Sequence, residues 1–143
     1  MFCIHKIHKL FQWQSGPPLP KGRGSHACTT MTDSGKDYIV VAGGILESSM
    51  LYLDITNGIT DSLTWQNGPE IPTRIFAHQL LQDVYEKDVL YLVGGTNSNT
   101  QKQDRIYILK GLSGSWEWFE QKLTRPLSGH LSFWAHESQL PCK

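Results

Sequence analysis

The sequence predicts an all-β fold built from repeated four-stranded antiparallel sheets. The main observation is that the chain matches itself at a displacement of about fifty residues, a spacing typical of repeat architectures. Residues 16–20 (GPPLP) recur 52 residues later as residues 68–72 (GPEIP), and residues 37–44 (DYIVVAGG) recur 51 residues later as residues 88–95 (DVLYLVGG). The second observation is that these apolar, β-branched runs are typical of strands covered on both faces.

The first copy contains four segments with strand character, separated by turn residues. Residues 33–35 (DSG) are a turn signal after the first segment, and the glycine pair Gly43-Gly44 allows a tight exit from the second. We expect the four strands at residues 25–32, 38–42, 50–55 and 62–66. Four strands in about fifty residues is the size of one blade of a β-propeller.

This repeat sets the expected domain organisation, in which residues 1–143 form one partial propeller. We expect the last strand of a preceding blade at about 7–14, blade one at about 23–67, blade two at about 74–120, and the first strand of a third blade at about 128–135. Propellers close with about four to eight blades, and closure protects their strand edges. An incomplete propeller is therefore predicted, either as a fragment of a longer protein or as a chain that self-associates through open strand edges.

Residues that recur at the same place in each copy are expected to pack neighbouring blades together. The large rings, which fill the wedge between blades, are Tyr52, Trp65, Tyr107 and Trp118. The remaining structural markers are Trp13, His26, Gly43, Gly44, His78, Gly94, Gly95 and His130. The three histidines are spaced by 52 residues, but a blade-to-blade step of about 10 Å exceeds the reach of zinc–nitrogen bonds of about 2 Å. We therefore predict a packing role for them and no metal site.

The order of these markers resembles the kelch-repeat family, whose repeat runs from an Arg and a small or His residue, through a double glycine, to a Tyr and a Trp. The first copy reads Arg23, His26, Gly43, Gly44, Tyr52 and Trp65, and the second reads Arg74, His78, Gly94, Gly95, Tyr107 and Trp118. The interval from Arg to His drifts from three to four to five residues along the chain. The resemblance covers nearly the whole chain and implies kelch-type blades. Propellers with Trp-Asp repeats are the near alternative, but that dipeptide is absent here.

The resemblance also implies a binding role. In kelch adaptors an Arg near the first strand often contacts acidic or phosphate-like groups of a partner, which makes Arg23, Arg74 and Arg125 the candidate partner-binding residues. In the alternative interpretation each Arg fixes its own loop or is solvated. The predicted function is a protein–protein interaction module with a protein partner. The alternative is part of a propeller enzyme, galactose-oxidase-like or carbohydrate-active, whose active site lies outside this chain.

Composition restricts the remaining classes of function. Thirteen Lys and Arg against thirteen Asp and Glu, with no basic block, predict no nucleic-acid partner. No apolar run is long enough to span a membrane. The three cysteines, Cys3, Cys28 and Cys142, are far apart and odd in number, which favours a reducing, cytoplasmic location. The sequence predicts no enzyme, no catalytic residue and no cofactor or metal, because no nucleophile motif or phosphate-binding loop is present.

Overall fold

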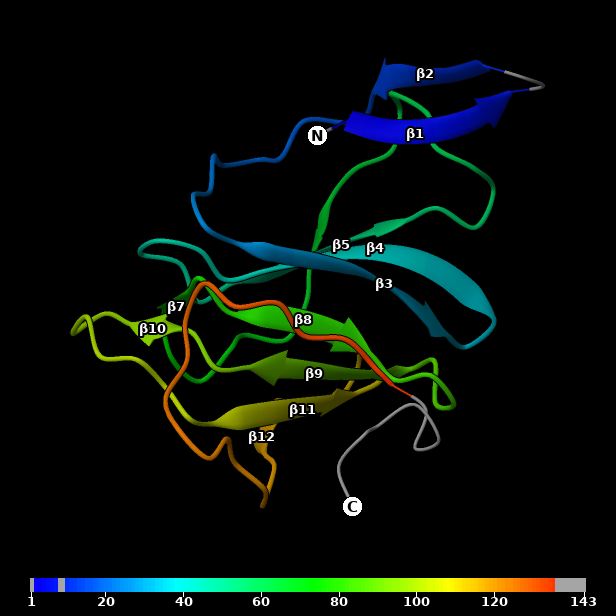
Figure 1. The fold of residues 1–143 in the computed structure, drawn as a ribbon. Coiled ribbons are helices and arrows are strands. Elements are labelled where there is room, and N and C mark those ends of the chain that lie inside the picture. Colours follow the sequence, from blue (N-terminus) through cyan, green and yellow to red (C-terminus); the bar gives the residue numbers. More distant parts are fainter. Residues whose placement is uncertain (1, 8–9, 136–143) are drawn as a thin grey trace.

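The structure is a computed structural model that describes residues 2–7 and 10–135, with side chains described from residue 15 onward. The predicted all-β fold is confirmed. Two four-stranded antiparallel sheets lie one against the other, with β3 beside β8 (Figure 1). The described residues contain strands and turns but no helix, and so none long and apolar enough to cross a membrane.

Sheet 1 has the order β3-β4-β5-β6, so each strand pairs with the next one in sequence. Its strands are β3 (Ala27–Asp33), β4 (Lys36–Ala42), β5 (Met50–Asp54) and β6 (Gln66–Asn67). Ser34 and Gly35 connect β3 to β4 with φ angles of 52° and 77°. Two positive φ values in a two-residue turn match the right-handed twist of the flanking strands, which explains why this turn sequence sets the register Asp33 opposite Lys36.

Sheet 2 repeats this arrangement in the order β8-β9-β11-β12. Its strands are β8 (Gln79–Gln82), β9 (Val89–Val93), β11 (Ile106–Lys110) and β12 (Glu117–Trp118). A short pair of strands, β7 (Ile75–Phe76) and β10 (Thr96–Asn97), joins two of its connecting loops.

The hydrophobic core lies between the two sheets. Tyr38, Val40 and Ala42 of β4 belong to one buried apolar cluster with Leu90 and Leu92 of β9. The complete cluster contains Ala27, Met31, Tyr38, Val40, Ala42, Met50, Ile71, Ile75, Leu80, Leu90, Leu92, Tyr107, Leu109 and Trp116. Since the residues of β4 between these, Ile39 and Val41, are buried as well, β4 is covered on both faces as the apolar run predicts.

The structure corrects one of the aromatic packing residues. Trp65 is half-buried and donates its indole N–H to the carbonyl of Pro17 at 3.1 Å. In sheet 2 the matching bond comes from Trp116, which donates to the carbonyl of Pro69 at 3.1 Å and is buried in the core. Trp118, the expected packing residue, is 54% exposed. It is therefore Trp116, and not Trp118, that corresponds to Trp65.

The expected tyrosines lie closer to the core. Tyr107 is buried in the cluster between the sheets, and the half-buried Tyr52 packs against that cluster. The ring of Tyr52 meets Tyr38 edge to face, with ring centroids 5.5 Å apart. Trp118 instead stacks with Arg105, whose guanidinium carbon lies 4.3 Å from the ring centroid.

At the N-terminal end the expectation of one strand over residues 7–14 is corrected. The structure has two strands there, β1 (Phe2–Ile7) and β2 (Leu10–Ser15), which pair as an antiparallel hairpin with Phe2 opposite Ser15. Residue 7 therefore ends one strand instead of starting another. The expected packing role of Trp13 concerns a side chain outside those described.

At the C-terminal end the expected strand over residues 128–135 is not formed. Within their sheets β3 and β8 each pair only with the strand that follows them. By the same rule, residues 128–135 would pair with a strand that follows residue 135, and that part of the chain is outside the described residues. Residues 128–135 are irregular, and Trp134 in this segment donates its indole N–H to the carbonyl of Gln82 in β8.

Candidate functional site

The loops that carry the predicted binding residues meet at one edge of the molecule, on the left in Figure 1, which we call the loop edge. It is formed by residues 16–26, 43–49, 68–78, 94–105 and 119–130. Backbone hydrogen bonds connect these loops: Gly44 donates to Ile75 at 2.9 Å, and Gly95 donates to Leu127 at 2.8 Å. The loop edge is therefore an ordered surface and not a set of independent loops.

A residue with a left-handed backbone lies two residues before the first strand of each sheet, β3 and β8, and recurs 52 residues after the second at Gly129. Ser25, Ala77 and Gly129 are spaced by 52 residues and have φ angles of 53°, 52° and 63°. The amide of Ala77 donates to the carbonyl of Ser25, and the amide of Gly129 donates to the carbonyl of Ala77. This chain of bonds fixes each unit to the next. The sequence does not predict this feature, because Ser and Ala carry no signal for a positive φ.

The histidine after the second and third of these left-handed residues lies against a glycine of the preceding unit, and His78 lies between two glycines. A Cβ placed on Gly43 would lie 2.7 Å from Cε1 of His78, and one on Gly95 would lie 2.8 Å from the Cβ of His78. In the same way a Cβ on Gly94 would lie 2.8 Å from Cε1 of His130. The first glycine of each pair therefore leaves room for the histidine of the following unit.

Burial changes the protonation chemistry of these histidines. His78 is 2% exposed, and neither ring nitrogen has a hydrogen-bond partner among the described residues. Removal from water lowers its pKa to about 4, with the carbonyl of Ala42 opposing the shift. Burial also lowers the pKa of His130, whereas His26 is exposed. At neutral pH His78 is therefore an uncharged packing residue.

Arg23 is turned into the fold and does not face a partner. Its guanidinium donates to the carbonyl of Ser49 at 2.7 Å, to Oγ of Ser49 at 2.8 Å and to the carbonyl of Gly43 at 3.2 Å. Glu47 lies beside it and forms an ion pair with Lys21. The hydrogen bond from Lys21 is the main cause that lowers the pKa of Glu47, and the charge of Arg23 adds to it. Arg23 thus holds the loop at residues 43–49 in place.

The three predicted arginines are not equivalent in space. Counting by 52 residues, Arg23 corresponds to Ile75 and Leu127, whose carbonyls accept the bonds from the second glycines. Arg74 precedes Ile75 by one residue, and Arg125 precedes Leu127 by two. Both are exposed, and among the described residues neither side chain forms a hydrogen bond or an ion pair. The structure therefore separates one structural arginine from two surface arginines.

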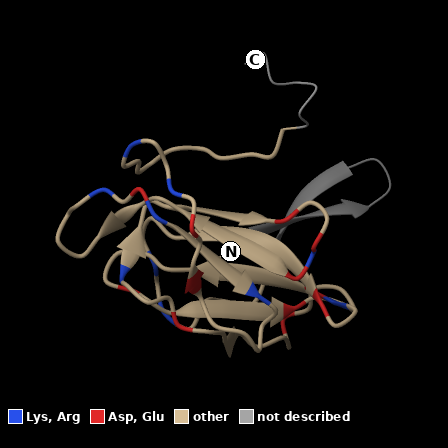
Figure 2. Ribbon diagram, turned by 90° about the horizontal axis from the view of Figure 1, so that it is seen from below, with Lys and Arg blue, Asp and Glu red and all other residues tan. Residues whose placement is uncertain are grey.

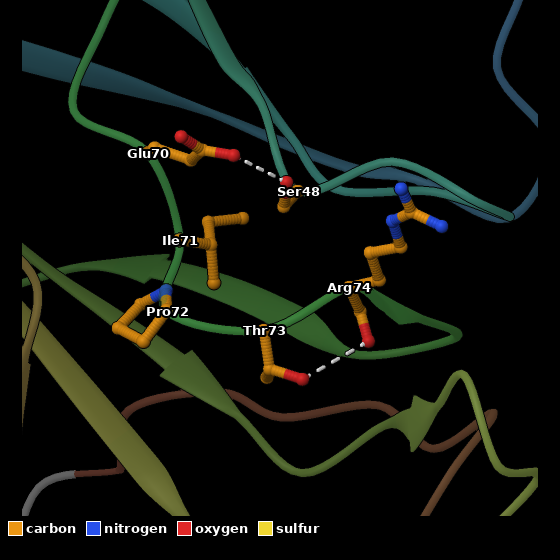
Figure 3. Close-up of a pocket in the computed structure, with 6 residues that line it drawn as sticks. All are labelled: Ser48, Glu70, Ile71, Pro72, Thr73 and Arg74. Atoms are coloured by element: carbon orange, nitrogen blue, oxygen red, sulfur yellow. Dashed lines mark hydrogen bonds between the residues drawn. The ribbon is translucent and has the colours of Figure 1, made fainter.

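Arg74 borders an open hollow of about 450 Å³ at the loop edge (Figure 3). The hollow is lined by Ser48, Glu70, Ile71, Pro72, Thr73 and Arg74. Glu70 accepts a hydrogen bond from Oγ of Ser48 at 2.7 Å, and Thr73 donates weakly to the carbonyl of Arg74 at 3.5 Å. In Figure 3 the side chain of Arg74 extends away from Glu70 and Pro72 towards the loop that carries Ser48.

Charged residues lie mainly in loops and at strand ends, with both signs interspersed (Figure 2). Among the described residues no group of three or more His, Cys, Asp and Glu side chains is placed to hold a metal ion. The loop edge therefore presents the exposed guanidinium of Arg74 beside a hollow.

Comparison with known proteins adds a likeness of fold. No protein-family model and no curated protein matches the chain. The solved structure of YjhT matches it with a TM-score of 0.64 at 17% sequence identity, over 85% of this chain. The chain spans about a third of the length of that structure, 33%. At this identity the likeness concerns the fold alone, and it agrees with the all-β arrangement of antiparallel sheets.

Proposed function

We propose that the chain supplies two kelch-type blades of a β-propeller and acts as a protein–protein interaction module. The sequence repeat supports this, as do two successive sheets with the same strand order and the same glycine–histidine contacts. Propellers close with about four to eight blades. The proposal therefore includes further blades, supplied by a longer protein of which this chain is a fragment.

The partner binds at the loop edge through an acidic segment. The observation that carries this proposal is the exposed guanidinium of Arg74 beside a hollow of about 450 Å³. Arginine binds a carboxylate or phosphate through two parallel hydrogen bonds, which gives both affinity and orientation. The carboxylate of Glu70, which lines the same hollow, already accepts a hydrogen bond from Ser48. The guanidinium is thus left free for an acidic group of the partner.

The test is binding of a glutamate-rich peptide, measured by fluorescence anisotropy on the wild-type chain and on the variant Arg74→Ala. We expect the dissociation constant to rise by about tenfold, the scale of one charge-assisted contact. Lys110→Ala is the matched control, because Lys110 is an exposed cation at the far end of β11. An equal loss of affinity in both variants would mean that only the overall charge matters, and it would refute a site at Arg74. No loss of affinity in either variant would refute it as well.

A further inference from the structure

Two apolar side chains, Ile45 and Leu46, are exposed in the loop that connects β4 to β5. They are 51% and 70% exposed, and we call them the apolar tip. Ile45 still packs over Gly24, since a Cβ on that glycine would lie 3.4 Å from Cδ1 of Ile45. Leu46 lies outside the buried core cluster, so packing in the core does not account for a leucine at this position.

Leu46 also adopts a backbone conformation that suits a leucine poorly. The amide of Glu47 donates to the carbonyl of Gly44 at 3.0 Å, which closes a four-residue turn with Leu46 in its third position at a φ of 64°. Glycine or asparagine is usual there, because a Cβ is disfavoured at positive φ. Leucine therefore weakens the turn, and strained residues of this kind gather at binding and active sites.

The second copy of the repeat has polar residues at these two positions. Ile45 and Leu46 correspond, 51 residues on, to Thr96 and Asn97. The side-chain oxygen of Asn97 accepts two backbone amides of its own loop, each at 3.0 Å, and so stabilises that loop. A leucine side chain cannot accept such bonds. The apolar tip is therefore a feature of the first copy and not a requirement of the repeat.

Two backbone hydrogen bonds hold the apolar tip beside the hollow of the proposed binding site. Gly44, just before the tip, donates to the carbonyl of Ile75 at 2.9 Å, and the amide of Ile71 donates to the carbonyl of Ser48 at 2.9 Å. The segment between Ile71 and Ile75 lines the hollow, as does Ser48. Since Leu46 is two residues from Ser48, their Cα atoms are at most about 7 Å apart.

The charges near the apolar tip favour an acidic partner segment. The three loops that meet here carry three cations and two carboxylates: Lys21, Arg23, Arg74, Glu47 and Glu70. Both carboxylates are engaged, Glu47 in an ion pair with Lys21 and Glu70 in the hydrogen bond from Ser48. The exposed guanidinium of Arg74 extends towards the loop that carries the tip (Figure 3). An acidic segment bound at Arg74 therefore also lies near the apolar tip.

We propose that the apolar tip binds a large apolar side chain of the same acidic segment that binds Arg74. This inference rests on the proposed function and names the kind of segment that the site selects. In an extended segment, side chains two residues apart lie on one face about 7 Å from each other. A glutamate and a leucine at that spacing match the step from Ser48, which lines the hollow, to Leu46. Arg74 supplies the charge contact, and Leu46 determines specificity.

The test is binding of two peptides to the 143-residue chain, measured by fluorescence anisotropy. One peptide has the core Glu-Ala-Leu-Ala-Glu and the other has the core Glu-Ala-Ala-Ala-Glu, so both carry the same charge. We expect the wild-type chain to bind the leucine peptide about tenfold more tightly, the scale of burying part of one leucine side chain.

Three variants separate the two contacts. Leu46→Asn removes the apolar contact and keeps the turn, because asparagine adopts a positive φ more readily than leucine. We expect it to lose the preference for the leucine peptide, with unchanged affinity for the alanine peptide. Arg74→Ala should weaken binding of both peptides about tenfold and keep the preference. Tyr85→Ser, the matched control, should change neither affinity, since Tyr85 is 85% exposed but lies between β8 and β9, at the opposite end of sheet 2 from the loop edge.

Three results would overturn the inference, and they distinguish it from the proposed function. Equal binding of both peptides by the wild-type chain, weakened in Arg74→Ala, would keep the acidic site and exclude the apolar contact. A leucine preference that persists in Leu46→Asn would place that contact at other residues. No binding of either peptide would refute the proposed function, and the inference with it.

Discussion

Sheet 1 and sheet 2 share a strand order and a set of marker residues but differ in their surroundings. In sheet 1, β4 is buried on both faces, whereas in sheet 2 the side chain of Tyr91 on β9 remains half-exposed. The two strands have the same apolar pattern, so their local sequence does not cause the difference. The burial of a repeated residue is decided by the unit that follows it in space.

The histidines make the same comparison residue by residue. His78 lies between Gly43 and Gly95 and is buried, whereas among the described glycines His130 lies against Gly94 only and is half-buried. His26 has no glycine of a preceding unit beside it among the described residues and is exposed. The contact between sheets 1 and 2 around His78, which we call the sealed junction, is thus the most completely buried of the three. We expect substitutions there to change the free energy of unfolding most strongly.

The largest expected effect is at the glycine inside the sealed junction. In Gly43→Ala the new methyl group would lie 2.5 Å from the carbonyl oxygen of Ile75, at a φ of 62°. Left-handed strain of about 1–2 kcal/mol and overpacking of about 1–3 kcal/mol together lower the free energy of unfolding by about 3 kcal/mol. Urea denaturation followed by fluorescence measures this loss.

Two further glycines provide the controls for that substitution. Gly94→Ala has the same φ strain, but its neighbour His130 is less enclosed, so we expect a smaller loss than for Gly43→Ala. Gly58→Ala has a φ of 90° and no atom within 4 Å, so strain of about 1–2 kcal/mol is the only cost. Equal losses at all three positions would show that packing against histidine contributes nothing.

The next effect is a pH dependence that comes from His78. Its pKa is about 4 in the folded protein and 6.5 when exposed to water, so the unfolded chain binds the proton more tightly. The free energy of unfolding is therefore constant above about pH 6.5 and falls as the pH drops, by about 3 kcal/mol at pH 4. Denaturation curves at several pH values measure the slope.

The variant His78→Gln isolates this contribution because it cannot be protonated. We expect its stability to vary less between pH 6.5 and 4.5, whatever its absolute value. This window lies above the range in which Glu47, Asp54 and Asp83 take up protons, since the pKa of each carboxyl is lowered. The same slope in the variant and the wild type would assign the pH dependence to other groups.

The smallest expected effect is a gain in stability at the left-handed residue of the sealed junction. Ala77 has a φ of 52°, and this left-handed conformation costs about 1–2 kcal/mol for a residue with a Cβ. Glycine removes that strain, but it loses about 0.5–1 kcal/mol more backbone entropy on folding. Ala77→Gly should therefore raise the free energy of unfolding by about 0.5–1 kcal/mol. Thermal denaturation checks it, and an unchanged or lower midpoint would contradict the strain argument.

The sequence was informative wherever the repeat and the turn chemistry acted together. The DSG turn and the apolar run before Gly43 predicted β3 and β4 to within a few residues. The matching run before Gly94 did the same for β9. Periodicity works here because a strand buried on both faces leaves little freedom in its residue types.

The sequence was less informative where one side chain had to be chosen over a neighbour. Trp116 and Trp118 are two residues apart near the end of sheet 2, and one-residue changes in loop length shift the copies against each other. The same drift aligned Arg23 with Arg74, although the 52-residue spacing aligns Arg23 with Ile75. Contacts such as the bond from Trp116 to Pro69 resolve these choices, and they depend on residues far away in sequence.

The hydrogen bonds from Ala77 to Ser25 and from Gly129 to Ala77 also bear on how such a chain can evolve. In both bonds the acceptor is a backbone carbonyl, and the donor is the amide found 52 residues later, in the following unit. Duplication or deletion of one unit in the gene would therefore restore the same link between new neighbours. Because the link uses main-chain atoms, side chains on the units can diverge widely while the join between them is inherited unchanged.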